Sequence, residues 1–250
     1  RPVSNVSQAL QGQIPGLNMS VSNNGGSLES TMNFNIRGTG TLGSGSSASP
    51  LVLIDGVEGD MNTLNPNDIE NISVLKDASS SSIYGARAAF GVILITTKNG
   101  KAGKTHVNYS GNVRFNDGIG IPKMANSYDF ATMFNAANVN DGKAPIFNDA
   151  YMQNIKDYMD GKLTQSTVAN GNVWAKWNEG AYDNIDWFNE FYKSWVPSQE
   201  HNLSISGGNE KTQYVLSGNF LGQNGLLRHG KDYMNRYTLN GKITTQLASW

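Results

Sequence analysis

Few side chains in this sequence have the types and spacing that enzyme chemistry requires. Asp55, Glu58 and Asp60 form a small acidic group after an apolar run, but a calcium loop needs further oxygen ligands at fixed spacing, so we interpret the group as a turn. The three histidines are far apart in the chain and lack the spacing of metal ligands. No G-x-S-x-G nucleophile motif occurs, and there is no cysteine. We therefore expect no catalytic residue, no metal site and no cofactor, and hence no enzyme.

Two arginines stand out because charged residues make up only 16% of the chain. Arg37 follows the alternating residues Phe34 and Ile36, and Arg87 lies between a short predicted helix and the run richest in β-branched residues. In a chain so poor in charge, we expect each arginine to pair with an acidic group. One interpretation is a local surface ion pair, which contributes about 1 kcal/mol or less. The other is a charged contact with a wall that surrounds this part of the chain.

Aromatic residues gather in two places where they could serve binding. Trp187, Phe188, Tyr192 and Trp195 form a dense cluster, which is interpreted as an interfacial girdle or a loop core, although such rings also stack on sugars. Trp174 and Trp177 lie in a stretch rich in Gly and Asn, where a core role is harder to justify. They are candidate substrate contacts.

The composition narrows the class of protein. The net charge is −1, so the chain lacks the positive surface that nucleic-acid binding requires. Asn accounts for about one residue in eight, so polar uncharged side chains carry the hydrophilic character. The longest apolar stretch, residues 88–95, is far shorter than the ~20 residues of a membrane-spanning helix. A membrane β-barrel remains compatible with the sequence because its strands alternate and leave no long apolar run.

Up to about residue 103, short helices and strands mix. A helix is predicted over Gln8–Leu17, stopped by Gly12, Pro15 and Gly16, and another over Ala78–Tyr84, ended by Gly85. Strands are predicted at 33–37, 51–54, 72–76 and 91–97, and the second of these closes with the turn signal Asp55-Gly56. This is the pattern of a small α+β unit.

From residue 104 onward, apolar and polar residues alternate with the period of a strand. Val107, Tyr109 and Val113 share one face of the first strand, and the same pattern returns at 202–207, 213–220 and 237–244. A soluble antiparallel sheet shows this alternation too. The connections favour a membrane barrel, since a tight hairpin at 208–210 separates a connection of 117–197 from one of 222–231, and barrels alternate short turns with long outer loops. Helices are predicted inside the long connection at 127–138 and 149–160.

Several segments carry a family resemblance. The run FNIRG at 34–38 is similar to the IRG motif of TonB-dependent receptor plugs, and PLVLIDGV at 50–57 resembles another plug segment. The run IYGARAAFGVILITTK at 83–98 closely resembles the SusC/RagA family, although Phe90 stands where that family usually has Asn. The other segments that resemble this family are 67–78, 186–187 and 201–208.

The resemblance implies a fold. Residues 1–103 would be an α+β plug domain whose start is truncated. Residues 104–250 would be the first strands and outer loops of an antiparallel transmembrane β-barrel, with about 22 strands in the family and about four here. Residues 117–197 would form a long extracellular loop. Arg37 and Arg87 would face acidic residues of the barrel wall and help to hold the plug closed.

The resemblance also implies a function. The family imports oligosaccharides or other large nutrients, in some members peptides, across the bacterial outer membrane, and the plug gates the barrel. The implied partners are the TonB–ExbB–ExbD complex of the inner membrane, a SusD-like surface lipoprotein, the substrate and the lipid bilayer. The alternative is a surface glycan-binding module that transports nothing. A glycan hydrolase would need paired carboxylates around a cleft, which the sequence does not show.

Overall fold

The computed structural model describes residues 5–14, 17–21, 28, 32–36, 49–77, 82–167, 169–170, 173–174 and 180–247. Two of the predicted site residues, Arg37 and Trp177, lie outside the described residues. The chain forms two compact units. The first contains residues 1–116, 196–225 and 231–250, and the second contains residues 117–195 and 226–230.

The N-terminal domain, which we define as the elements from α1 to β6, contains two small sheets. Strands β1 (Leu17–Val21) and β2 (Met32–Ile36) form an antiparallel pair. The larger sheet has the order β4-β3-β6-β5, in which β3 and β6 run parallel. Its strands are β3 (Leu51–Ile54), β4 (Val57–Glu58), β5 (Ile69–Leu75) and β6 (Val92–Thr97); the helical elements are α1 (Val6–Leu10) and the 3₁₀ turns η1 (Met61–Thr63), η2 (Pro66–Asp68) and η3 (Ser82–Ala88).

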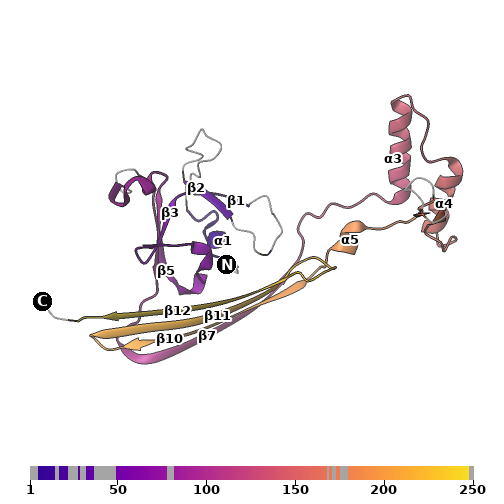
Figure 1. The fold of residues 1–250 in the computed structure, drawn as a ribbon. Coiled ribbons are helices and arrows are strands. Elements are labelled where there is room, and N and C mark those ends of the chain that lie inside the picture. The colour runs from indigo at the N-terminus through magenta and orange to yellow at the C-terminus, as the bar shows by residue number, and fades with distance from the viewer. Residues whose placement is uncertain are drawn as a thin grey trace. The chain divides into compact units, whose positions relative to one another are not determined.

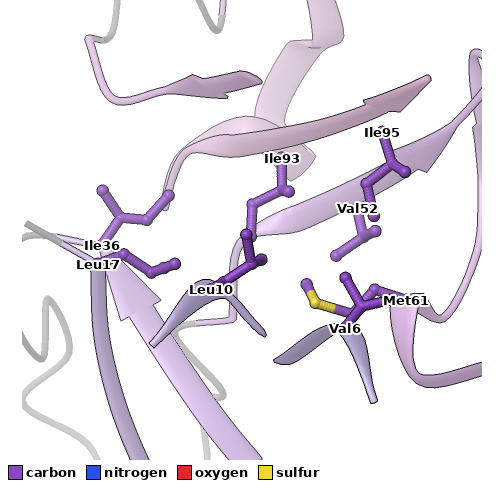
Figure 2. Packing of buried hydrophobic residues seen from close by; sticks show 8 residues of the cluster. All are labelled: Val6, Leu10, Leu17, Ile36, Val52, Met61, Ile93 and Ile95. Atoms are coloured by element: carbon purple, nitrogen blue, oxygen red, sulfur yellow. The ribbon is translucent and has the colours of Figure 1, made fainter. Parts of the chain in front are cut away.

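The core of the N-terminal domain is apolar. Figure 2 shows side chains from α1, both small sheets and η1 packed together, with Val6 and Ile93 fully buried. Burial of each such aliphatic side chain contributes about 1.5–3 kcal/mol. The β-branched run that predicts the strongest strand therefore forms β6, and its residues supply the centre of this core. The buried cluster consists of Val6, Leu10, Leu17, Ile36, Val52, Met61, Ile93 and Ile95.

One helix prediction in this domain is wrong in extent, and a second has its predicted end confirmed. Helix α1 ends at Leu10, and Leu17 begins strand β1 instead of closing a helix. Asn5 supplies the cap that the prediction missed, because its side chain accepts a hydrogen bond from the Gln8 backbone. The second predicted helix, at 78–84, is a 3₁₀ turn in its described part, which begins at Ser82. Gly85 ends this turn as predicted, because its backbone angles (φ 72°, ψ −159°) are not helical, and a second short turn follows as far as Ala88.

The long sheet, β7 with β10 to β12, has the order β12-β11-β10-β7, and every neighbouring pair is antiparallel. Figure 1 shows the four strands lying side by side as one twisted ribbon. The predicted hairpin is confirmed: the Asn209 side chain accepts hydrogen bonds from the backbone of Lys211 and Thr212. The strands are β7 (Gly103–Asn116), β10 (Val196–Gly208), β11 (Thr212–Asn224) and β12 (Tyr233–Thr245).

The second unit is a small helical body. Helices α3 (Ser127–Asn140) and α4 (Asp149–Met159) form where the sequence predicts them, and Asn148 caps α4 by accepting a hydrogen bond from the Tyr151 backbone. Their shared core is aromatic, and Tyr151 is also tied through its hydroxyl to the Ala181 carbonyl. The remaining elements are α5 (Trp187–Phe191) and the short pair β8 (Ala169–Asn170) and β9 (Val173–Trp174).

Candidate functional site between the N-terminal domain and the long sheet

An ion pair joins the N-terminal domain to the long sheet. Nζ of Lys242, on β12, lies 3.1 Å from Oδ1 of Asp55, at the end of β3. The same ammonium group lies 3.4 Å from the Thr97 hydroxyl at the end of β6. The side chains of Lys242 and Asp55 are only 26% and 29% exposed, so solvent screens this pair less than a surface pair.

Residues of the N-terminal domain position the Asp55 carboxylate independently of Lys242. Asp55 and Gly56 both have positive φ (49° and 89°), as a two-residue I′ hairpin turn between β3 and β4 requires. The carboxylate accepts hydrogen bonds from the backbone and the hydroxyl of Thr97. Burial alone would raise the pKa of Asp55, but the hydrogen bonds from Thr97 and Lys242 outweigh burial and hold that pKa below its usual 3.8. Asp55 is therefore a fixed negative charge at neutral pH.

A second contact centres on Glu200 of β10. One oxygen accepts a hydrogen bond of 2.8 Å from Arg114 of β7, and the side chains of this pair are 14% and 13% exposed. The other oxygen accepts a hydrogen bond of 3.2 Å from the Asn67 amide of the N-terminal domain. Lys98 in turn donates to the Asn67 carbonyl. Arg114 thus positions Glu200 within the sheet, and Glu200 contacts the N-terminal domain through the neutral amide of Asn67.

These contacts define two faces of the long sheet. The inner face carries Arg114, Glu200 and Lys242, which make the contacts just described. The outer face carries exposed apolar side chains, with Leu239 79% and Ile243 74% exposed. The strand register places the two sets on opposite sides, as the alternation in the sequence predicts.

Rings and glycines interlock on the outer face. Tyr109 donates or accepts a 2.7 Å hydrogen bond with Nδ1 of His201, and a methyl group at Gly111 would sit 3.0 Å from that tyrosine hydroxyl. His201 stacks on Phe220, which packs against Tyr237, so one row of rings crosses all four strands. Glycine thus makes room for an aromatic ring that covers its bare backbone.

Of the two interpretations for Arg87, the described residues contain the local ion pair. Arg87 lies in η3 with its side chain 72% exposed, and it pairs with Glu58 of the same domain. Such a pair is a weak local contact. The contact of Arg87 with a surrounding wall, like that of Arg37, stays a prediction.

The aromatic candidates belong to the second unit. Trp187 stacks on Phe191 and Phe188 stacks on Tyr192 along α5, while Trp195 is 70% exposed at a positive φ of 57°. Arg228 donates to the carbonyls of Asn189 and Tyr192, so the connection between β11 and β12 closes the end of α5. Trp174 lies in β9, and its side chain is not among those described. The interfacial and substrate-contact roles remain predictions.

Sequence reasoning missed Lys242, Asn67 and Glu200 as contact residues, and it assigned Asp55 only to a turn. One signal could have found Lys242: it is the single charged residue on the polar face of an otherwise Thr and Asn strand segment, 238–244. Asn67 gave no such signal, because its partner lies 133 residues away.

Within the described residues, polar contacts join the N-terminal domain to the long sheet. Among these residues, no three His, Asp or Glu side chains converge as metal ligands. No described helix is long and apolar enough to cross a membrane.

Comparison with known proteins identifies the parts. Residues 1–92 match the family described as TonB-dependent Receptor Plug Domain. The chain is 32% identical over 241 residues to TonB-dependent receptor P39 of Formosa agariphila, covering 96% of this chain and 20% of that protein. It is 30% identical over 236 residues to TonB-dependent receptor SusC of Bacteroides thetaiotaomicron, covering 90% of this chain and 20% of SusC.

A solved structure agrees over the whole chain. The structure described as the RagAB peptide transporter matches with a TM-score of 0.75 at 28% identity, covering 100% of this chain and 28% of that chain. The α+β domain is therefore the plug, and the long sheet is the beginning of the antiparallel barrel wall. This chain spans about a fifth of the length of the curated relatives it matches. It belongs to the SusC/RagA family of TonB-dependent receptors.

Proposed function

We propose that the protein containing this chain imports large nutrients actively across the bacterial outer membrane and that the plug gates the barrel. The observation that carries the proposal is the two-faced wall. Its outer face is apolar and aromatic, as contact with lipid requires. Its inner face is polar and is ion-paired to the plug through Asp55 and Lys242. A surface glycan-binding module would also have an apolar sheet face, but it would not need a polar face that is ion-paired to a plug.

The gating step follows from the kind of contact that holds the plug. The Asp55–Lys242 pair and the Asn67–Glu200 hydrogen bond join groups that water can solvate once they separate. Such contacts are strong enough to seat the plug and can be broken without unfolding its apolar core. We propose that the TonB–ExbB–ExbD complex supplies the force that moves the plug.

The proposed substrate is an oligosaccharide, with a peptide as the second class. One relative carries the name SusC, and another structure is described as a peptide importer with two components, RagAB. By the same similarity we propose a SusD-like surface lipoprotein as the partner that captures substrate at the outer loops. In this function the protein moves its substrate without altering it, so we propose no enzymatic activity.

Uptake by cells tests the proposal. Cells that express the full-length protein together with its neighbouring lipoprotein are given fluorescently labelled maltoheptaose, other labelled glycans and labelled peptides. We expect one class to accumulate inside the outer membrane, and a protonophore to abolish accumulation without abolishing surface binding. Surface binding with no accumulation for any class would support the glycan-binding module instead, and chemically shortened products made by the purified protein would contradict the absence of catalysis.

A further inference from the structure

Two rows of side chains cross the inner face of the wall without a single charge. Each row follows the strand register from β7 through β10 and β11 to β12. Every member is an amide or a hydroxyl, so each can donate and accept hydrogen bonds. The rows are Asn108, Ser204, Ser217 and Asn240, and Ser110, Asn202, Asn219 and Thr238.

We call the two rows together the neutral band. Titratable residues border the band on both sides. Glu200 and Arg236 share the register position next to the row that contains Asn202. His106 and Lys242 share the position next to the row that contains Ser204. Glu200 and Lys242 are the residues that contact the plug. The neutral band therefore lies between the Glu200 and Lys242 contacts with the described part of the plug.

A cavity of about 710 Å³ opens onto the band. Five members of the rows line it from the wall: Asn108, Ser110, Asn202, Ser204 and Asn240. The plug side is lined by residues 67–70 and by parts of the segment that leads from β6 into β7, including Lys98 and Lys101. The cavity lies toward the end of the wall with the tight hairpin, away from the long connection. Its volume is within the range of about 300–1,000 Å³ that is typical of small-molecule sites.

The band contains buried polar atoms that the described residues leave without a partner. Asn202 lines the cavity and is 4% exposed, yet its Nδ2 has no hydrogen-bond partner among the described residues. The same holds for Oγ of Ser217, which is 2% exposed and lies one row away. A buried polar atom without a partner costs about 1–3 kcal/mol, so each of these atoms gains by acquiring one. Asn202 lines the cavity, and a turn of its side chain would bring the amide to a ligand there.

We propose that this cavity is a binding site for a neutral polyhydroxylated ligand, which is a sugar unit of the imported substrate on its way past the plug. The inference rests on the proposed import function and specifies a site for its substrate. Sugar hydroxyls donate and accept at once, as the amide and hydroxyl rows do. The wall contributes no Lys or Arg to the cavity, and the two lysines on the plug side, Lys98 and Lys101, are matched in number by Asp68 and Glu70. The lining therefore does not favour an anion, and the two rows offer no apolar pocket for peptide side chains.

Thiol protection in the full-length protein tests the site directly. Ser204→Cys places a thiol in the cavity, and Leu203→Cys places one on the outer face of the same strand as the matched control. In a background without other reactive cysteines, each variant is labelled with a small methanethiosulfonate in detergent, with and without maltotriose. We expect maltotriose at twice its dissociation constant to slow labelling at position 204 by about threefold, through simple site occupancy, and to leave position 203 unchanged.

Three further arms make the result decisive. Adding Asn202→Leu to Ser204→Cys should abolish protection while labelling without sugar continues. Asn240→Cys, across the band, should show protection in parallel, so a single variant that fails to fold does not decide the matter. Triglycine and sulfate should not protect. Absence of protection at both 204 and 240, equal slowing at 203, or equal protection by triglycine overturns the proposal. Loss of nutrient uptake by the unmodified protein would instead contradict the import function, so the two failures are distinguishable.

Discussion

The interior of the plug is held together by apolar packing, whereas its contact with the wall is made of polar interactions. Inside the plug, Val6, Ile93 and Ile95 are almost completely buried in an apolar cluster. At the wall, the plug is held by an ion pair whose side chains are about a quarter exposed and by an amide hydrogen bond to Glu200. A polar cavity lies next to these contacts. Apolar packing is lost only by unfolding, whereas polar contacts can be exchanged for water. The plug is therefore suited to move as a folded body.

The largest effect should come from the plug interior. Ile93→Ala removes a fully buried side chain and should lower the free energy of unfolding of the plug by about 4 kcal/mol. Hydrogen exchange of the plug amides in the full-length protein measures this change. Ile83→Ala, at a position that is 82% exposed, is the matched control and should be neutral. Equal effects of the two substitutions would show that the core does not hold the plug together.

The next effect should come from Glu200. Glu200→Gln removes the charge that Arg114 faces in a pair less than 15% exposed on both sides, and breaking it should cost about 3 kcal/mol. We expect the plug to seat less firmly, so that single-channel recordings show more frequent leak openings. Glu210→Gln, in the hairpin, should behave like the unmodified protein. An unchanged frequency of leak openings with Glu200→Gln would show that Glu200 does not help to seat the plug.

A smaller effect is expected at Lys242, and it should depend on pH. Lys242→Met removes the ion pair with Asp55 at a cost of about 1–2 kcal/mol, so leak should exceed that of the unmodified protein at neutral pH and the difference should shrink as Asp55 becomes protonated. In the unmodified protein the pKa of Asp55 is below its usual 3.8. The contact therefore contributes fully above about pH 4 and is lost as the pH falls through the lowered folded pKa. Leak recorded from pH 7 down to pH 3 checks both curves; coincident curves would contradict the assignment.

The smallest effect is expected at Arg87. The side chain is mostly exposed and pairs with Glu58 inside the plug, so Arg87→Ala should change stability by less than about 1 kcal/mol and leave uptake nearly unchanged. Measured uptake and leak compare this variant with Lys242→Met. A larger effect of Arg87→Ala would favour the wall contact that the sequence predicts for this arginine.

The contrast between the regions also explains what sequence reasoning could reach. Alternation assigned the two faces of the wall, and the β-branched run and the Asp55-Gly56 turn signal located strands β6 and β3 correctly. Helix α1 was overextended, because packing against the sheets places Leu17 in a strand that local pattern does not reveal. The contact between Asn67 and Glu200 could not be predicted from the sequence, because it depends on how two distant segments meet. A polar residue on a polar face gives no local sign of its partner.

One measurement tests most directly whether the plug must leave its contact with the wall. Asp55→Cys and Lys242→Cys are combined in the full-length protein, in a background without other reactive cysteines, and joined by a short reducible bis-thiosulfonate linker. Uptake of the labelled substrate is then measured before and after reduction, with each single variant treated in the same way. We expect uptake to stop in the linked protein and to return on reduction. Uptake that continues unchanged in fully linked protein would contradict this expectation.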